Sequence, residues 1–208
     1  MDFKFEPVIE ELKKRRKIFV SEADLQLEIA LIIREIYPKA KVRLEFHPVF
    51  DPNIHIDILV VLDGKWYPIE LKYKTLDCEH DVDDEAFYLK KHGAQSEGCY
   101  LYLKDIQRIE KDKEAMPEFK HGYTMFLTND MSYTRGAKKA DCNYADFSFG
   151  DGEVKTGKME WGAGSSALRR KSICSPITLK GKYPMKWQTY SVLDDSKAGT
   201  FKYVVNEI

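Results

Sequence analysis

Residues 54–74 read IHIDILVVLDGKWYPIELKYK and place two β-rich runs on either side of the pair Asp63-Gly64. An Asp-Gly pair between two such runs is typical of a tight β-hairpin. If the turn has two residues, Leu62 lies opposite Lys65. The same antiparallel register then places Asp57 opposite Glu70. The sequence therefore predicts an antiparallel hairpin that carries two opposed carboxylates.

Side chains alternate between the faces of a sheet, so this register puts His55, Asp57, Glu70 and Lys72 on one face. Two opposed carboxylates repel each other, whereas a bound divalent cation would turn the repulsion into attraction. A nearby lysine can orient a water molecule and offset charge on a phosphate. The alternative is a surface hairpin on which Lys72 only neutralises Glu70 or Asp57.

The opposite face of the hairpin is expected to be an apolar core surface. It would carry Ile54, Ile56, Ile58, Val60, Leu62, Tyr67, Ile69, Leu71 and Tyr73. The polar face also contains Leu59, Val61, Trp66 and Pro68, so we expect it to be partly covered. A covered polar face favours a site over a solvated hairpin.

The stretch from Ser21 to Tyr37 predicts a helix, with Ser21 as its N-cap and Pro38 after its end. On this helix Glu28 shares a face with apolar residues. A carboxylate in such a setting is unfavourable unless it is paired or bound to a metal, so we expect Glu28 to approach the hairpin. The alternative is a glutamate satisfied by a lysine or a backbone donor.

The remaining pattern predicts helices over 6–17 and 96–114, strands over 41–49, 54–62, 65–74 and 122–127, and late strands over 177–179, 187–192 and 201–205. The polar, acidic stretch 75–98 predicts a long surface loop. The order helix, three strands, helix, strand indicates an α/β fold with a central mixed sheet flanked by helices. We expect a single domain over 1–208, with a core at 21–128 and a β-rich C-terminal extension at 131–208.

Composition narrows the classes of protein. The net charge of −1 and the pI near 6.5 argue against a protein that coats nucleic acid by bulk charge. The four cysteines form no CxxC pair and are expected to be free thiols. No apolar run is long enough to span a membrane and the first residues lack a signal-peptide core, so we expect a cytoplasmic protein with no membrane partner.

The pattern His55-Ile56-Asp57, then twelve residues, then Glu70-Leu71-Lys72 resembles the D…ExK core of the PD-(D/E)XK nuclease superfamily. The preceding helix and the αβββαβ order are similar as well, over roughly residues 21–128. Ile56 stands where the motif has proline. The resemblance implies a restriction-endonuclease-like core.

The resemblance also implies residue roles and a function. Mg²⁺ or Mn²⁺ would be held by Glu28, Asp57, Glu70 and the main-chain carbonyl of Leu71, while Lys72 would position the attacking water. Gln95 and His55 would contact the substrate. The implied function is that of a metal-dependent nuclease of the restriction or repair type, which acts on nucleic acid. DNA is the expected substrate. The alternative is a non-catalytic nucleic-acid-binding or interaction module on the same fold; monomer and homodimer both stay open.

Overall fold

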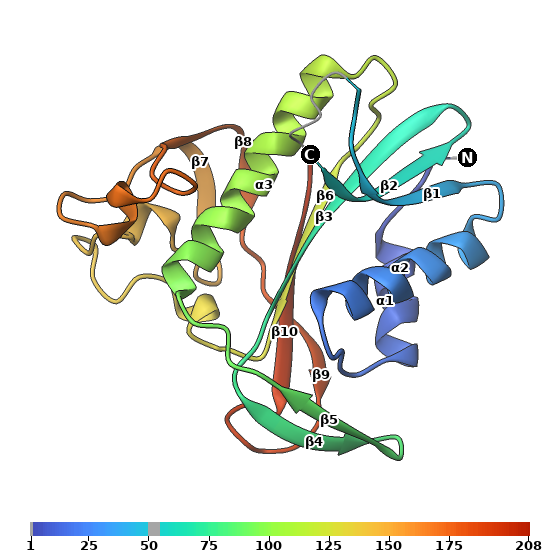
Figure 1. The fold of residues 1–208 in the computed structure, drawn as a ribbon, viewed down its shortest axis with the longest axis horizontal. Helices are drawn as coiled ribbons and strands as arrows, with labels where there is room; N and C mark the ends of the chain where they lie inside the picture. The colour runs from blue at the N-terminus through green and yellow to red at the C-terminus, as the bar shows by residue number, and fades with distance from the viewer. Residues whose placement is uncertain (1, 50–54) are drawn as a thin grey trace.

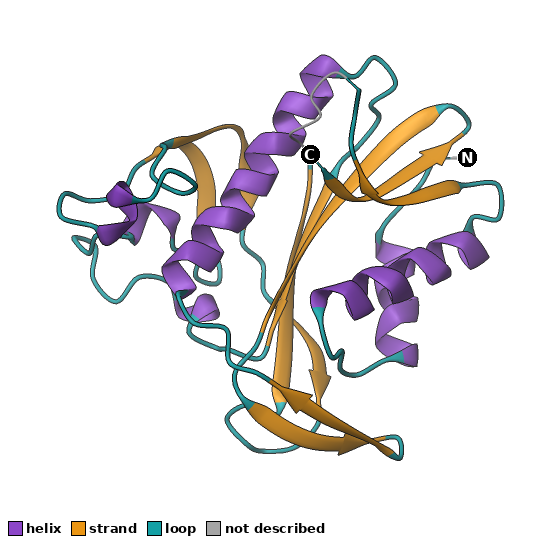
Figure 2. Ribbon diagram, in the orientation of Figure 1, coloured by secondary structure: helices purple, strands orange, loops and turns teal. Residues whose placement is uncertain are grey.

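The computed structural model describes residues 2–49 and 55–208. A six-stranded mixed sheet, in the order β1-β2-β3-β6-β10-β9, runs through the middle of these residues. Helices α1 and α2 pack on one side of the sheet and α3 on the other (Figures 1 and 2). The helices are α1 (Glu6–Arg15), α2 (Glu22–Ile36) and α3 (Gln95–Ala115); the sheet strands are β1 (Lys41–Phe46), β2 (Ile56–Leu62), β3 (Lys65–Lys74), β6 (Tyr123–Thr128), β9 (Gln188–Val192) and β10 (Thr200–Glu207).

The predicted hairpin is confirmed in its turn and its register. Strands β2 and β3 pair antiparallel from Leu62↔Lys65 to Ile58↔Ile69. Asp63 and Gly64 have φ of 50° and 75°, the left-handed backbone that a two-residue turn between twisted strands requires. The helix that precedes the hairpin also begins as expected, because the Ser21 side chain accepts a hydrogen bond of 3.1 Å from the Asp24 N–H.

Most of the predicted apolar face is buried against α1 and α2, but Ile56 is an exception. Ile58, Val60 and Leu62 belong to the core on that side, whereas Ile56 packs with Leu59 and Met116. Glu45 on β1, between the pairs Leu44↔Ile58 and Phe46↔Ile56, has φ of 49°. A residue in this conformation interrupts the regular alternation of the strands, so the prediction for Ile56 was wrong; Ile54 lies outside the described residues.

The polar face of the hairpin is partly covered, as expected. Leu59 is buried beside Met116, and the half-buried Val61 and Trp66 pack against the same cluster together with Phe119. Met116 and Phe119, which cover this face, follow the end of α3 in the sequence. The polar face of the hairpin is therefore on the same side of the sheet as α3.

The predicted long loop over 75–98 is wrong, because half of it forms a second hairpin and its last residues begin α3. Strand β4 (Cys78–Val82) pairs antiparallel with β5 (Glu85–Leu89). Asp83 and Asp84 make the turn with φ of 52° and 67°. The hairpin is held to the core by Phe87 and Leu89, both of which are buried.

The late strands lie at the predicted positions; β8 and β10 are longer than predicted, and β9 is one residue shorter. Strand β8 (Ile177–Pro184) pairs with β7 (Val154–Met159), which the sequence pattern did not indicate. Strands β9 and β10 join the central sheet, where β10 lies between β6 and β9. None of the described helices is long and apolar enough to cross a membrane.

The two-residue turn of the first hairpin gives a test of its geometry. We expect Gly64→Ala to lower the free energy of unfolding by about 1 kcal/mol, because an L-residue in the left-handed region is strained. A Cβ at this position meets no atom within 4 Å, so the backbone conformation alone would account for the loss. Urea unfolding of the variant and the wild type measures the difference.

Gly93→Ala is a matched control. Position 93 is equally open to a Cβ, and its φ is not in the left-handed region. We expect no loss of stability there, and a small gain is consistent with a less flexible unfolded chain. Equal losses at positions 64 and 93 would contradict the turn geometry.

Candidate metal-binding and active site

The candidate site lies where β3 changes its partner strand. Its ladder with β2 ends at Ile58↔Ile69, while its parallel ladder with β6 runs from Ile69↔Tyr123 to Lys74↔Thr128. Beyond Ile69, therefore, the edge of β3 that faced β2 has no partner strand among the described residues. The main-chain groups of Leu71 and Tyr73 on that edge need other partners.

Carboxylates supply these partners. Asp57 Oδ2 accepts a hydrogen bond of 2.7 Å from the Leu71 N–H. Glu22 Oε2, at the start of α2, accepts one of 2.6 Å from the Tyr73 N–H. The carbonyl of Leu71 accepts a hydrogen bond of 2.9 Å from Lys72 Nζ. Two acidic side chains and one ammonium group thus meet along the open edge of β3.

Helix α3 adds a second layer of charge. Lys72 Nζ lies 2.7 Å from Asp105 Oδ2. The guanidinium of Arg108 contacts both oxygens of Glu70: Nε lies 3.2 Å from Oε1, and Nη2 lies 2.5 Å from Oε2. The same Nη2 atom also lies 2.9 Å from Asp105 Oδ1. Glu70 is only 1% exposed, so this pairing lies inside the protein.

The cluster contains more negative than positive charge. Glu22, Asp57, Glu70 and Asp105 are four carboxylates, whereas Lys72, Arg108 and, near Glu22, Lys74 are three cations. Burial, followed by the neighbouring charge of Asp105, raises the pKa of Glu70 well above its usual value of 4.5. Burial also raises the pKa of Asp57 and of Glu22. The fold therefore holds carboxylates where their charge is unfavourable without a further cation.

Lys72 stays protonated in this setting. Burial alone would lower its pKa, but the negative charges of Asp105, Glu22 and Asp57 outweigh burial and raise it. A lysine with a raised pKa does not take a proton from water at neutral pH. Its chemistry is that of a fixed positive charge and a hydrogen-bond donor.

The structure brings together Asp57, Glu70, Lys72 and the carbonyl of Leu71, but the glutamate that joins them from α2 is Glu22 and not Glu28. Six residues separate the two, which places them about 120° apart around the helix. Glu28 is half-buried and lies near the hydroxyl of Tyr190, which bonds to main-chain carbonyls of Leu12 and Arg16. None of the described contacts joins Glu28 to the cluster.

Gln95 lies away from the cluster as well. It is the first residue of α3 and donates a hydrogen bond of 3.1 Å to Asp130 Oδ2. Ten residues of helix separate it from Asp105, a distance of about 15 Å along the axis. It lines a hollow of about 470 Å³ together with Arg135 and Lys138, and neither Asp57 nor Glu70 lines this hollow.

His55 does lie beside the cluster. Its Nδ1 is 3.4 Å from Glu45 Oε2 and 4.0 Å from Asp57 Oδ1. The side chain of His55 is half exposed, and Asp57 is 8% exposed. His55 therefore marks the side from which solvent reaches the buried carboxylates.

Glu22, Asp105 and Arg108 were missed in the sequence. The signal for the α3 pair was its spacing: positions 105 and 108 lie about 60° apart on one face of the helix, and Asp105 lies beside the apolar Ile109, which is unusual for a charged group. Glu22 looked like an ordinary acidic residue in the first turn of a helix. Its contact with Tyr73, 51 positions away, depends on tertiary structure.

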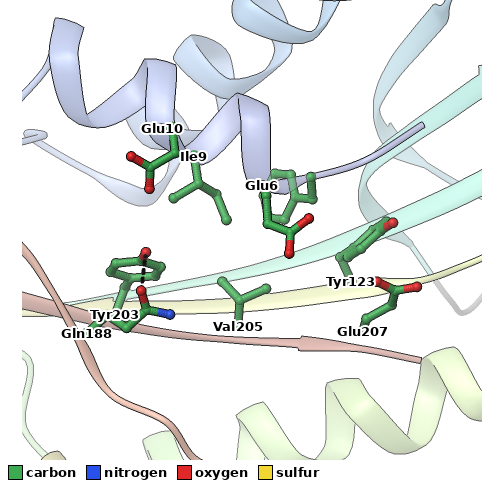
Figure 3. Close-up of a pocket in the computed structure, with 9 residues that line it drawn as sticks. Glu6, Ile9, Glu10, Tyr123, Gln188, Tyr203, Val205 and Glu207 are labelled. Atoms are coloured by element: carbon green, nitrogen blue, oxygen red, sulfur yellow. Dashed lines mark hydrogen bonds between the residues drawn. The ribbon is translucent and has the colours of Figure 1, made fainter. Parts of the chain in front are cut away.

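A second hollow lies between α1 and the sheet and is separate from this cluster (Figure 3). Glu6, Glu10 and Glu207 stand at its margin with Tyr123 and Tyr203, and Tyr203 donates a hydrogen bond to Gln188. The two sites share no lining residue. Two of its acidic groups have partly exposed partners of their own: Glu10 lies 3.3 Å from Lys13 Nζ, and Glu207 lies 2.8 Å from His121 Nδ1.

Comparisons with protein-family models, curated proteins and solved structures found no match to this chain. A function for this chain must therefore rest on the geometry and charge of its own residues.

The buried carboxylate of Glu70 predicts a specific pH dependence. Because its pKa is raised in the folded state, the folded protein keeps a proton on Glu70 that the unfolded chain releases near pH 4.5. The wild type should then lose stability as pH rises from about 4.5 through the folded-state pKa, by about 1.4 kcal/mol per unit of pKa difference. Glu70→Gln does not titrate and should not show this loss.

Urea unfolding in EDTA, at several values between about pH 5 and pH 8, measures this difference. The stability of the wild type minus that of Glu70→Gln should fall as pH rises. Glu79→Gln, at an exposed position of β4, controls for the loss of one charge. A difference that grows with pH would mean that Glu70 is stabilised as a charged partner of Arg108.

Proposed function

We propose that this chain is a metal-dependent phosphodiesterase that cleaves nucleic acid, with DNA as the first substrate to test. The observation that carries the proposal is the surplus of carboxylates around the open edge of β3: Glu22, Asp57, Glu70 and Asp105 against Lys72, Arg108 and Lys74. A divalent cation would remove that surplus. Fixed positive groups beside it suit a phosphate substrate.

The order of elements supports a restriction-endonuclease-like core as part of the proposal. The chain runs α2, β1, β2, β3, then α3 and β6 after the β4–β5 hairpin. The first three strands are antiparallel neighbours, and β3 is parallel to β6. This arrangement agrees with the αβββαβ pattern that the D…ExK resemblance implies.

The donor groups fit a hard divalent cation. Asp57, Glu70 and the carbonyl of Leu71 offer oxygen atoms, which Mg²⁺ and Mn²⁺ prefer. In such a site the bound cation supplies a Lewis acid that activates water and stabilises charge on the phosphate. In the structure, Lys72 lies against the Leu71 carbonyl and Arg108 against Glu70, so these cations sit beside the donors that a metal would use.

The protein's own residues have distinct tasks in this proposal. Asp105 holds Lys72 as an ammonium group that can orient water or contact a phosphate oxygen. Arg108 fixes the carboxylate of Glu70 from α3 and is a positioning residue. Asp57 and Glu22 accept from the main-chain donors of β3 in place of a partner strand, so that two carboxylates lie beside the main chain at Leu71 and Tyr73.

A second candidate function is a non-catalytic nucleic-acid-binding or interaction module on the same fold. The observation that favours it is the burial of Glu70, whose two oxygens both face Arg108. A carboxylate held in this way can serve as part of a buried ion network with no metal. The two candidates differ in turnover and in the response of the fold to metal.

Cleavage assays test the proposal directly. The wild type should cut at least one of plasmid, linear duplex, single-stranded DNA or RNA in Mg²⁺ or Mn²⁺, and none of them in EDTA. Lys72→Ala should lose roughly 10²-fold or more of the rate, because it removes the charge that orients the reacting groups. Lys65→Ala is a matched control at the exposed start of the same strand and should keep the wild-type rate.

Equal cleavage by the Lys72 and Lys65 variants would remove Lys72 from the mechanism. No cleavage by the wild type on any of the four substrates would favour the non-catalytic module.

Thermal melting separates a metal site from an ion network. Millimolar Mn²⁺ should raise the melting temperature of the wild type, because a ligand that binds only the folded state stabilises it. Asp57→Asn keeps the shape and an acceptor for the Leu71 N–H, but should lose most of this gain. A lower melting temperature of Asp57→Asn in EDTA, with an unchanged response to metal, would make Asp57 a structural group.

A further inference from the structure

Three potential ligands converge on the exposed side of the cluster. The Nδ1 atom of His55 lies 3.4 Å from Glu45 Oε2 and 4.0 Å from Asp57 Oδ1, and the three ligand atoms all lie within 4.8 Å of one another. Two ligands about 2.1 Å from one metal ion are about 3.0–3.4 Å apart at tetrahedral or octahedral angles. The triad is therefore within a small adjustment of a metal coordination shell.

The backbone and a buried amide hold this triad in place. Gln26 on α2 is buried and donates from Nε2 to Glu45 Oε1 at 2.8 Å and to the main-chain carbonyl of Asp57 at 2.5 Å. It thereby links β1 to β2 beside the ligands. Glu45 adopts φ of 49°, a conformation that a non-glycine residue takes only when its surroundings demand it. Supporting groups of this kind are typical around metal ligands.

We propose that Glu45, His55 and Asp57 form a second divalent-cation site, which shares Asp57 with the proposed catalytic site. The two oxygens of Asp57 suit this sharing, since Oδ2 accepts from the Leu71 N–H while Oδ1 faces His55. Glu45 and His55 are each about half exposed, so water can complete the coordination.

The imidazole decides which metals this site takes. One nitrogen and two carboxylate ligands suit Mn²⁺, Co²⁺ or Zn²⁺, whereas Mg²⁺ prefers oxygen ligands alone. The second site should therefore bind Mn²⁺ more tightly than Mg²⁺, by roughly tenfold or more. Removal of His55 should abolish this preference.

The inference extends the proposed function by one further metal, but its test does not need turnover. Pulsed electron paramagnetic resonance of the full chain loaded with Mn²⁺ detects the nitrogen of a directly bound imidazole. The wild type should show this ¹⁴N signal. Glu70→Gln should keep it, because Glu70 contributes nothing to the second site, while His55→Ala should lose it and bind Mn²⁺ roughly tenfold more weakly or worse.

His121→Ala is the matched control, because His121 is also partly exposed and paired with a glutamate, 2.8 Å from Glu207 Oε1. It should keep the ¹⁴N signal. Three results would each overturn the second site: a ¹⁴N signal that persists in His55→Ala, a signal that is lost in Glu70→Gln, or a Mn²⁺-loaded wild type without the signal. In the last case His55 serves only as an ion-pair partner of Glu45. A ¹⁴N signal without any cleavage would uphold the site and remove the proposed nuclease function.

Discussion

The change of partner along β3 is the constraint on which the rest of the structure depends. A strand that leaves its neighbour exposes main-chain donors, and buried donors must be satisfied. Here carboxylates from β2 and α2 take the place of a strand, through Asp57 to Leu71 and Glu22 to Tyr73. The same contacts that complete the backbone hydrogen bonding thus concentrate negative charge beside the main chain of Leu71 and Tyr73.

Asp105 and Arg108 on α3 form a buried ion network with Lys72 and Glu70. A buried ion network contributes little net stability, although removing one partner from it typically costs about 3–5 kcal/mol. Asp105 and Arg108 are therefore poor explanations for the stability of the fold as such. They do explain how Lys72 and Glu70 are kept in fixed positions on the same face of β3.

Local signals in the sequence predicted the parts of this structure that depend on local geometry. The Asp63-Gly64 turn and the period-two pattern were enough for the register of the first hairpin, and Ser21 was enough for the start of α2. The hairpin at 78–89 was missed because acidic residues fill its exposed positions and an Asp-Asp pair makes its turn.

Contacts between residues far apart in the sequence could not be predicted from the sequence pattern. The choice between Glu22 and Glu28 depends on the rotation of α2 about its axis relative to the sheet, which a helical pattern does not specify. The pairing of Arg108 with Glu70 joins elements 38 residues apart and depends on how α3 crosses β3. Ile56 was misplaced because a single left-handed residue on the neighbouring strand, Glu45, breaks the alternation on which the prediction relied.

The position of β10 has a consequence for how the chain is made. Residues 200–207 lie between β6 and β9, so the strand that pairs with the far edge of β6 comes from a segment that the ribosome synthesises more than seventy residues after Thr128. Until that segment emerges, β6, whose six residues are all buried in the finished fold, has an open edge. Such non-local pairing slows folding and leaves the unfinished sheet exposed to aggregation until β10 is in place.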